Sequence, residues 1–199
     1  MKKSAQTILR PDAFYTIAAA NGRVLEVADF NTENGASVRL WSYEGQPWQQ
    51  WQFVEAGEDE YRIKNRFTGK VMDLAMSGVS NGTWVHQWSQ TSGAGQRWQV
   101  VEAGGGRVKL RNVLADKVLD LVDMRVENGA QAQIWLEVPG GNQEWNLERV
   151  DDITARTAPH PDEAAYHPHM PPPRRGQDDL VRKLNQSGKG RGSRKGSKA

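Results

Sequence analysis

The sequence repeats the phrase Gln-x-Trp three times at a fixed spacing. The copies end at Trp51, Trp98 and Trp145, which lie two equal steps of 47 residues apart. Two further sets of residues keep the same step: the pairs Asn34-Gly35, Asn81-Gly82 and Asn128-Gly129, and the tryptophans Trp41, Trp88 and Trp135. Several landmarks in one phase are typical of three copies of a single supersecondary unit. This repeat constrains the fold more than any other property of the chain.

Each copy is predicted to consist of short strands. Its apolar residues come in brief runs bounded by turn residues, which is a strand pattern rather than a helical one. In the first copy the runs are Phe14 to Ile17, Val24 to Val27, Val38 to Trp41 and Gln50 to Val54. Four short strands cannot bury their own apolar face, so the three copies must share one core. A closed barrel of about a dozen strands with pseudo-threefold symmetry leaves few strand edges unpaired.

Three copies of this length, each ending in Gln-x-Trp, resemble the ricin B-type lectin family, also known as family 13 carbohydrate-binding modules. The resemblance covers Phe14 to about Val150 and implies an all-β fold, the β-trefoil. We therefore expect a trefoil domain over residues 14–152, with repeats at about 14–59, 60–106 and 107–152. An N-terminal arm (1–13) would precede it and a Pro/His-rich linker with a basic tail (153–199) would follow it.

The two sets of tryptophans are predicted to have different roles. Those of the Gln-x-Trp phrases lie in the last strand of each copy, where indoles related by threefold symmetry would meet in the shared core. Trp41, Trp88 and Trp135 stand at strand ends followed by polar or turn-forming residues, where one ring face can meet solvent. The C–H face of a pyranose ring packs on such a plane, while its hydroxyls need paired donors and acceptors. The alternative is that these three indoles only close the ends of the barrel.

The resemblance also implies which residues bind sugar: an acid, an aromatic residue fifteen positions later, and an Asn-Gln pair before the core tryptophan. In the third copy these are Asp120, Trp135, Asn142 and Gln143. In the second copy they are Asp73, Trp88 and Gln96, with Gly95 in place of asparagine. In the first copy they are Glu26, Trp41 and Gln49, with Trp48 in place of asparagine.

These departures predict that the third copy binds best, the second weakly, and the first not at all or with altered preference. A sugar hydroxyl left facing an unpaired buried group costs about 1–3 kcal/mol. The alternative for Asp73 and Asp120 is that each only orders the turn after its strand. The expected ligand is a glycan or polysaccharide of galactose or xylose type, held by shallow sites whose avidity rises when several act together.

The sequence does not favour an enzyme, a cofactor or a metal site. His86 is the only histidine in the repeats, and no nucleophile elbow, P-loop or zincin phrase occurs. Asp73 and Asp120 belong to different copies, which we expect to be too far apart for a glycosidase pair. The chain has no cysteine, so disulfides and thiolate metal sites are excluded. His160, His167 and His169 lie in a proline-rich stretch and are a weak metal candidate.

The basic character of the chain belongs to its tail. Residues 159–199 hold nine Lys and Arg against four Asp and Glu, whereas the whole chain has a net charge of +2. Gln177 to Gln186 is a candidate short helix, and the last thirteen residues are a basic low-complexity segment. An alternative function is therefore a structural or adaptor subunit, in which the trefoil is a rigid scaffold and residues 174–199 bind a protein partner or a polyanion.

The N-terminus does not resemble a secretion signal. Residues 1–10 have a basic start but no apolar run of the required length, and no segment approaches the length of a membrane span. The expectation is a protein made in the cytoplasm, exported only by another route or as part of an assembly. We expect a monomeric trefoil unless the tail assembles it.

Overall fold

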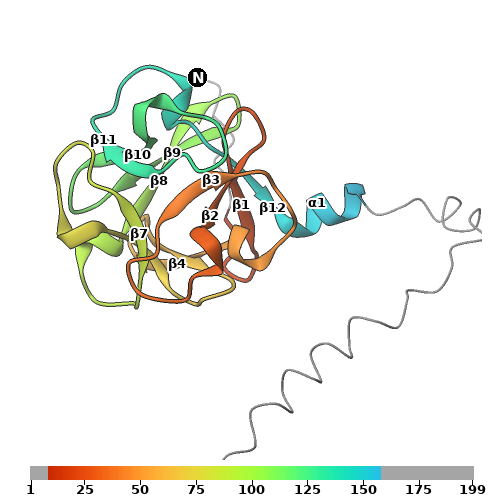
Figure 1. The fold of residues 1–199 in the computed structure, drawn as a ribbon, viewed down its shortest axis with the longest axis horizontal. Coiled ribbons are helices and arrows are strands. Elements are labelled where there is room, and N and C mark those ends of the chain that lie inside the picture. The colour runs from red at the N-terminus through yellow and green to blue at the C-terminus, as the bar shows by residue number, and fades with distance from the viewer. Residues whose placement is uncertain (1–8, 158–199) are drawn as a thin grey trace, which may run out of the picture. The chain divides into compact units, whose positions relative to one another are not determined.

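The structure of the chain, a computed structural model, describes residues 9–157. Within that range it contains twelve strands, four from each repeat (Figure 1). We call residues 14–59, 60–106 and 107–152 the first, second and third lobes. The strands of the first lobe are β1 (Tyr15–Ala18), β2 (Val24–Val27), β3 (Val38–Trp41) and β4 (Trp51–Gly57). Those of the second are β5 (Glu60–Asn65), β6 (Val71–Leu74), β7 (Val85–Trp88) and β8 (Trp98–Gly104). Those of the third are β9 (Arg107–Asn112), β10 (Lys117–Leu121), β11 (Ala132–Trp135) and β12 (Asn146–Arg149).

Six of these strands close a barrel. Antiparallel pairing runs from β12 through β1, β4, β5 and β8 to β9. A bridge between Val108 and Trp145 joins β9 to the start of the last strand and completes the ring. Each core tryptophan pairs with the first strand of its own lobe in the same way, as Tyr15 does with Trp51 and Tyr61 with Trp98. The all-β trefoil expected from the sequence is confirmed.

The remaining strands form three hairpins that cap the barrel: β2–β3, β6–β7 and β10–β11. Each hairpin turn carries an Asn-Gly pair, and Gly82 has a φ of 84°, a conformation that glycine adopts without strain. The Gly82 N–H donates to the carbonyl of Ile134 in the third lobe. Gly35 and Gly129 bond to Gln87 and Leu40 in the same manner. The turn of each lobe is therefore hydrogen-bonded to the third strand of a neighbouring lobe.

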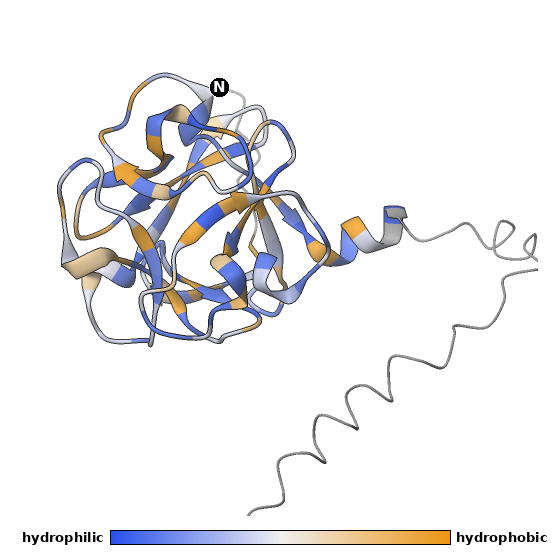
Figure 2. Cartoon of the chain, in the orientation of Figure 1, coloured by the Kyte–Doolittle hydropathy of each residue, from blue (hydrophilic) through white to orange (hydrophobic). Residues whose placement is uncertain are grey.

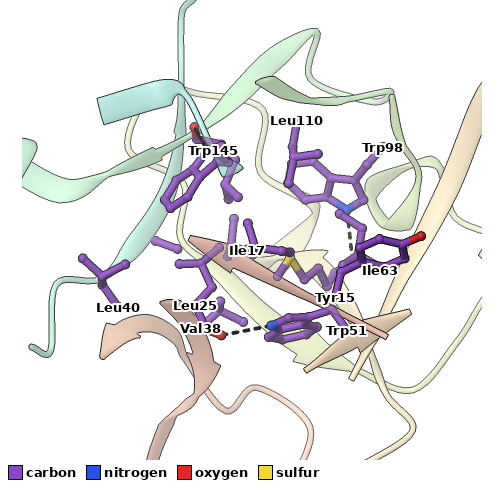
Figure 3. Packing of buried hydrophobic residues seen from close by; sticks show 14 of the residues in the cluster. Tyr15, Ile17, Leu25, Val38, Leu40, Trp51, Ile63, Trp98, Leu110 and Trp145 are labelled. Atoms are coloured by element: carbon purple, nitrogen blue, oxygen red, sulfur yellow. Dashed lines mark hydrogen bonds between the residues drawn. The ribbon is translucent and has the colours of Figure 1, made fainter. Parts of the chain in front are cut away.

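The three indoles of the Gln-x-Trp phrases lie in the shared core, as predicted. Trp51, Trp98 and Trp145 are at most 1% exposed, and Figure 3 shows them on three sides of a cluster that includes Ile17. Each indole N–H donates to a backbone carbonyl on the second strand of its lobe, for example from Trp145 to Leu119 at 3.3 Å. A buried indole needs such an acceptor. The bond fixes Leu119, and with it the next residue, Asp120.

Short 3-10 turns and one α-helix complete the described fold. The 3-10 turns are η1 (Ala28–Phe30), η2 (Pro47–Gln49), η3 (Ala75–Ser77), η4 (Ala94–Gln96), η5 (Val122–Met124) and η6 (Gly141–Gln143). The helix α1 (Val150–Thr157) was not expected, and the expected boundary after residue 152 falls inside it. Its Val150 and Ile153 are buried. Along the strands, apolar residues are interspersed with polar ones (Figure 2), which suits sheets with one face in the core.

Several expectations concern parts of the chain that the structure does not describe. Most of the N-terminal arm, the three tail histidines, the candidate helix at 177–186 and the basic segment lie outside residues 9–157. Over the described part, the structure has no helix long and apolar enough to cross a membrane.

Candidate ligand-binding site

A hollow of about 350 Å³ opens on the outer face of the third lobe. Its lining includes Asp120, Gln133, Trp135, Val138, Pro139 and Asn142. Asp120 is only 4% exposed, while Trp135 is 39% exposed and has an accessible indole. A half-buried aromatic plane and a sheltered carboxylate therefore share one small concavity.

Strand register brings these residues together. Along β10, Leu119 faces the core, so the next residue, Asp120, points to the outer face. Asp120 pairs directly with Gln133 on β11, which places the two side chains on the same face. Trp135 follows Gln133 by two positions and therefore shares that face as well. Asn142 approaches from η6, just before the core tryptophan Trp145.

Three amide groups hold the Asp120 carboxylate. Its Oδ2 accepts hydrogen bonds from Gln143 Nε2 at 2.7 Å and from Asn142 Nδ2 at 3.1 Å. Its Oδ1 accepts one from Gln133 Nε2 at 3.3 Å. Hydrogen bonds from several donors fix the orientation of a carboxylate. Asp120 is thus a preoriented acceptor at the side of the hollow.

Gln143 positions the site rather than lining it. Its side chain is fully buried, its amide also donates to the Leu136 carbonyl, and its oxygen accepts the Val138 N–H. Gln49 and Gln96 are equally buried and tie the corresponding loops of their own lobes. The resemblance implied that all three glutamines contact sugar, but their burial leaves no surface for a ligand. Each instead connects the loop after the third strand to the lobe's interior.

Ion pairs hold the loop that forms one wall of the hollow. Lys109 Nζ lies 2.9 Å from Glu137 Oε1 and also bonds the Val138 carbonyl, and Arg111 pairs with the same carboxylate. Lys109, and to a lesser degree Arg111, hold the pKa of Glu137 below its usual range. Val138 and Pro139 are therefore kept beside Trp135 at neutral pH.

In the second lobe a histidine stacks on the corresponding aromatic residue. The His86 ring stacks on Trp88 with ring centroids 5.3 Å apart and an interplanar angle of 25°. His86 Nε2 also lies 3.6 Å from Asp73 Oδ2. Asp73 Oδ1 accepts the N–H of Leu74, the last residue of its own strand. Asp73 and Trp88 are brought together as expected, but a side chain of the protein occupies the space between them.

In the first lobe an arginine fills the same place. The Arg39 guanidinium lies 4.3 Å from the ring centroid of Trp41, and its Nε bonds Glu26 Oε1 at 3.0 Å. Burial raises the pKa of the Glu26 carboxyl, and hydrogen bonds from Arg39 and Gln49 oppose this rise. Trp48, which replaces the expected asparagine, packs edge-on against exposed Phe30. The face of Trp41 is thus in contact with a cation of the protein itself.

The sequence reasoning missed the residue that distinguishes the three lobes. Arg39, His86 and Gln133 lie at the same step of 47 and each pairs directly across from the site acid of its lobe. His86 and Arg39 stack on the tryptophan two residues later, whereas Gln133 has neither an aromatic ring nor a charge and donates to Asp120 instead. The sequence did contain a signal for this residue: it lies two positions before the aromatic residue in the predicted strand, so the two side chains share one face.

Replacing Arg39 with alanine is expected to destabilise the protein more near pH 7 than near pH 5. Burial would then raise the pKa of Glu26 further, because the hydrogen bond from Gln49 would be the main remaining contact that opposes the rise. An acid with a raised pKa in the folded state contributes stability below its usual pKa, which is lost as pH rises through the raised value. We expect a loss of about 1–3 kcal/mol near pH 7, measured by urea denaturation. The double variant Arg39→Ala/Glu26→Gln should lack the pH-dependent part. Equal losses at both pH values would contradict this account.

A β-trefoil that presents an aromatic plane and a preoriented carboxylate on one lobe has the features of a lectin. The model of the family described as ricin-type β-trefoil lectin domain-like matches residues 7–88, 79–135 and 94–158. These matches cover more than half of the chain, and the chain therefore belongs to this family. Its fold is one of carbohydrate-binding proteins, as the sequence resemblance implied. A comparison with curated proteins gives no match.

Solved structures agree with this assignment. The designed threefold-symmetric protein ThreeFoil is 34% identical, with a TM-score of 0.67, and the match covers 68% of this chain and 98% of ThreeFoil. An exo-β-1,3-galactanase from Clostridium thermocellum is 27% identical over 71% of this chain, with a TM-score of 0.68, but only 31% of that enzyme is matched. A ricin B-like lectin from Macrolepiota procera, solved in complex with lactose, shares the fold at 19% identity and a TM-score of 0.62, over 72% of this chain and 99% of that lectin.

Proposed function

We propose that this protein is a non-catalytic lectin that binds a sugar of galactose or xylose type in the hollow of the third lobe. The observation that carries the proposal is the pairing of Trp135 with Asp120. The indole is accessible, and the carboxylate is held by three amides in the same concavity. The first and second lobes repeat the acid and the indole, but there Arg39 and His86 lie against the indole.

The chemistry of the hollow suits a pyranose. One ring face carries C–H groups that can pack on Trp135, and a hydroxyl that donates to Asp120 would be held by a charge-assisted hydrogen bond. Asn142, which is half-buried at the edge, can receive a neighbouring hydroxyl through its amide oxygen. The similarity to a galactanase and to a lectin solved with lactose supports galactose and lactose as the first ligands to test.

The surroundings of Asp120 favour binding over catalysis. A glycosidase needs two carboxyl groups flanking the scissile bond, one of which donates a proton. The hydrogen-bond partners that the described residues give to Asp120 are the amides of Gln133, Asn142 and Gln143. These groups orient a carboxylate but do not exchange a proton at neutral pH. We therefore assign the hollow a role in recognition.

Replacing Trp135 with alanine is expected to lower the affinity for the bound sugar about tenfold or more, because the stacking surface is removed. Trp88→Ala is a matched control, since Trp88 holds the same repeat position and is also 39% exposed. Binding of galactose, lactose and xylose by the whole chain can be measured by titration calorimetry, after a glycan array and a xylan pull-down. Absence of binding to every glycan, or equal losses in both variants, would overturn the proposal.

A further inference from the structure

We propose that Trp84 of the second lobe gives the third lobe's hollow a second stacking position, so that the ligand is an oligosaccharide rather than a single sugar. This inference rests on the proposed function and deepens it. It assigns the site to two lobes. The sequence repeat alone predicts that each site is formed by residues of a single lobe.

The strand register places Trp84 next to the hollow. Trp84 forms an antiparallel bridge with Gln133, and Gln133 pairs with Asp120 on its other side. Residues directly opposite one another in antiparallel strands project from the same face. Asp120 on β10, Gln133 on β11 and Trp84, which immediately precedes β7, therefore form a row on the outer face where the hollow opens.

The backbone around Trp84 is fixed by hydrogen bonds to both neighbours. The Ile134 N–H donates to the Thr83 carbonyl, and the Ala75 N–H donates to the carbonyl of Trp84 itself. The adjacent turn also abuts the first stacking residue, since a Cβ atom added to Gly82 would lie 3.8 Å from the Trp135 ring. The second lobe thus provides the indole of Trp84, and its turn at Gly82 also lies beside Trp135.

Trp84 is not required by the trefoil. It is 55% exposed, and the positions one repeat earlier and later hold Ser37 and Gln131. Ser37 lies across from His86, and Gln131 lies across from Arg39, the two residues that stack on Trp88 and Trp41. An aromatic residue therefore occurs in this position only beside the lobe whose own indole has neither the stacked imidazole of His86 nor the stacked guanidinium of Arg39. Exposed indoles are costly to leave in water, which favours a ligand that covers this one.

The spacing suits a second sugar unit. Trp84 and Asp120 are separated by two strand spacings, roughly 10 Å. This is comparable with the length of a disaccharide, so a sugar on Trp135 and Asp120 would place its neighbour near Trp84. A stacking contact depends on the ring plane more than on individual hydroxyls. The contact with Trp84 would therefore make the affinity depend on the length of the ligand more than on which sugar is second.

The test compares short and long ligands on the whole chain. Galactose and a galactotriose, and xylose and xylotriose, are titrated against the unaltered protein, Trp84→Ala and Trp135→Ala. We expect one trisaccharide to bind the unaltered protein about tenfold more tightly than its monosaccharide. Trp84→Ala should lose that gain and keep its monosaccharide affinity within about twofold. Trp135→Ala should weaken both ligands.

Two further variants serve as controls for a folding defect in Trp84→Ala. Trp84→Ser carries the residue found one repeat earlier, at Ser37, and should behave as Trp84→Ala does. Leu114→Ala removes another exposed apolar side chain and should change neither affinity. If the trisaccharides bind no better than the monosaccharides, or if Trp84→Ala keeps the gain, the second stacking position is refuted while the proposed function stands. If the unaltered protein binds none of the four sugars, both proposals fail.

Discussion

Replacing Trp98 with alanine is expected to lower the free energy of unfolding by about 3–5 kcal/mol. The indole is fully buried, and its N–H donates to the Met72 carbonyl at 3.3 Å. The substitution would leave a cavity where the barrel strands of the second lobe meet the cap, and would leave that carbonyl without its partner. Because a domain of this kind is stable by only about 5–15 kcal/mol, the loss is a large fraction of the total.

Guanidinium denaturation followed by circular dichroism measures this loss without relying on tryptophan fluorescence. Trp98→Phe should cost less, because it keeps most of the apolar volume and loses only the indole N–H and part of the ring. Trp84→Ala is the matched control for removing an indole from the surface, and should change the stability by less than about 1 kcal/mol. A loss at Trp98 no larger than that at Trp84 would show that the three indoles do not organise the core.

The fold could be predicted because the repeat carries redundant information. Each Gln-x-Trp phrase specifies a buried indole, and each Asn-Gly pair specifies a turn, so three copies report the same unit three times. The expected strand Val24 to Val27 and the expected strand Val38 to Trp41 match β2 and β3 in both bounds. The helix α1 has no counterpart in the repeat, and its eight residues follow the last copy, so the same reasoning could not reach it.

The site could be predicted only in part, because the family resemblance does not identify the residues that lie across from the three acids. The acid and the aromatic residue of each lobe do lie together. What lies against each indole differs with Arg39, His86 and Gln133, and their position across from the acids appears only when the strands are placed in register. The buried glutamines show the opposite error, because their place in the phrase suggested contact with sugar and their burial shows a positioning role.

The contribution of Trp84 illustrates a second limit. Trp84 immediately precedes β7 and lies near Gln133 because the two residues form a bridge. They belong to different lobes and are about one repeat apart in the sequence. A pattern read along the chain shows which residues alternate within a strand but not which lobes meet around the axis of the barrel. That information requires the topology, in which the turn of each lobe bonds to the third strand of another.

Replacing Asp120 with asparagine is expected to lower sugar affinity about 10- to 100-fold while the trefoil remains folded. Asparagine has nearly the same shape, but it removes the negative charge that would accept a sugar hydroxyl. It also turns an NH2 group toward the amide donors of Gln133 or of Asn142 and Gln143, which cannot accept its hydrogens in their present orientation. Titration calorimetry with the sugars that the unaltered protein binds measures the loss directly.

The matched control for this variant is Asp73→Asn, at the same step of the repeat. Asp73 lies beneath His86, which stacks on Trp88, so its substitution should leave sugar affinity within about twofold of the unaltered protein. Circular dichroism and the unfolding midpoint establish that both variants keep the fold. Because the two acids occupy equivalent strands and differ in that His86 lies beside Asp73, a larger loss in Asp73→Asn than in Asp120→Asn would place the binding site in the second lobe. Such a result would show that the stacking of His86 on Trp88 does not exclude a ligand and that Trp135 and Asp120 are not the binding residues.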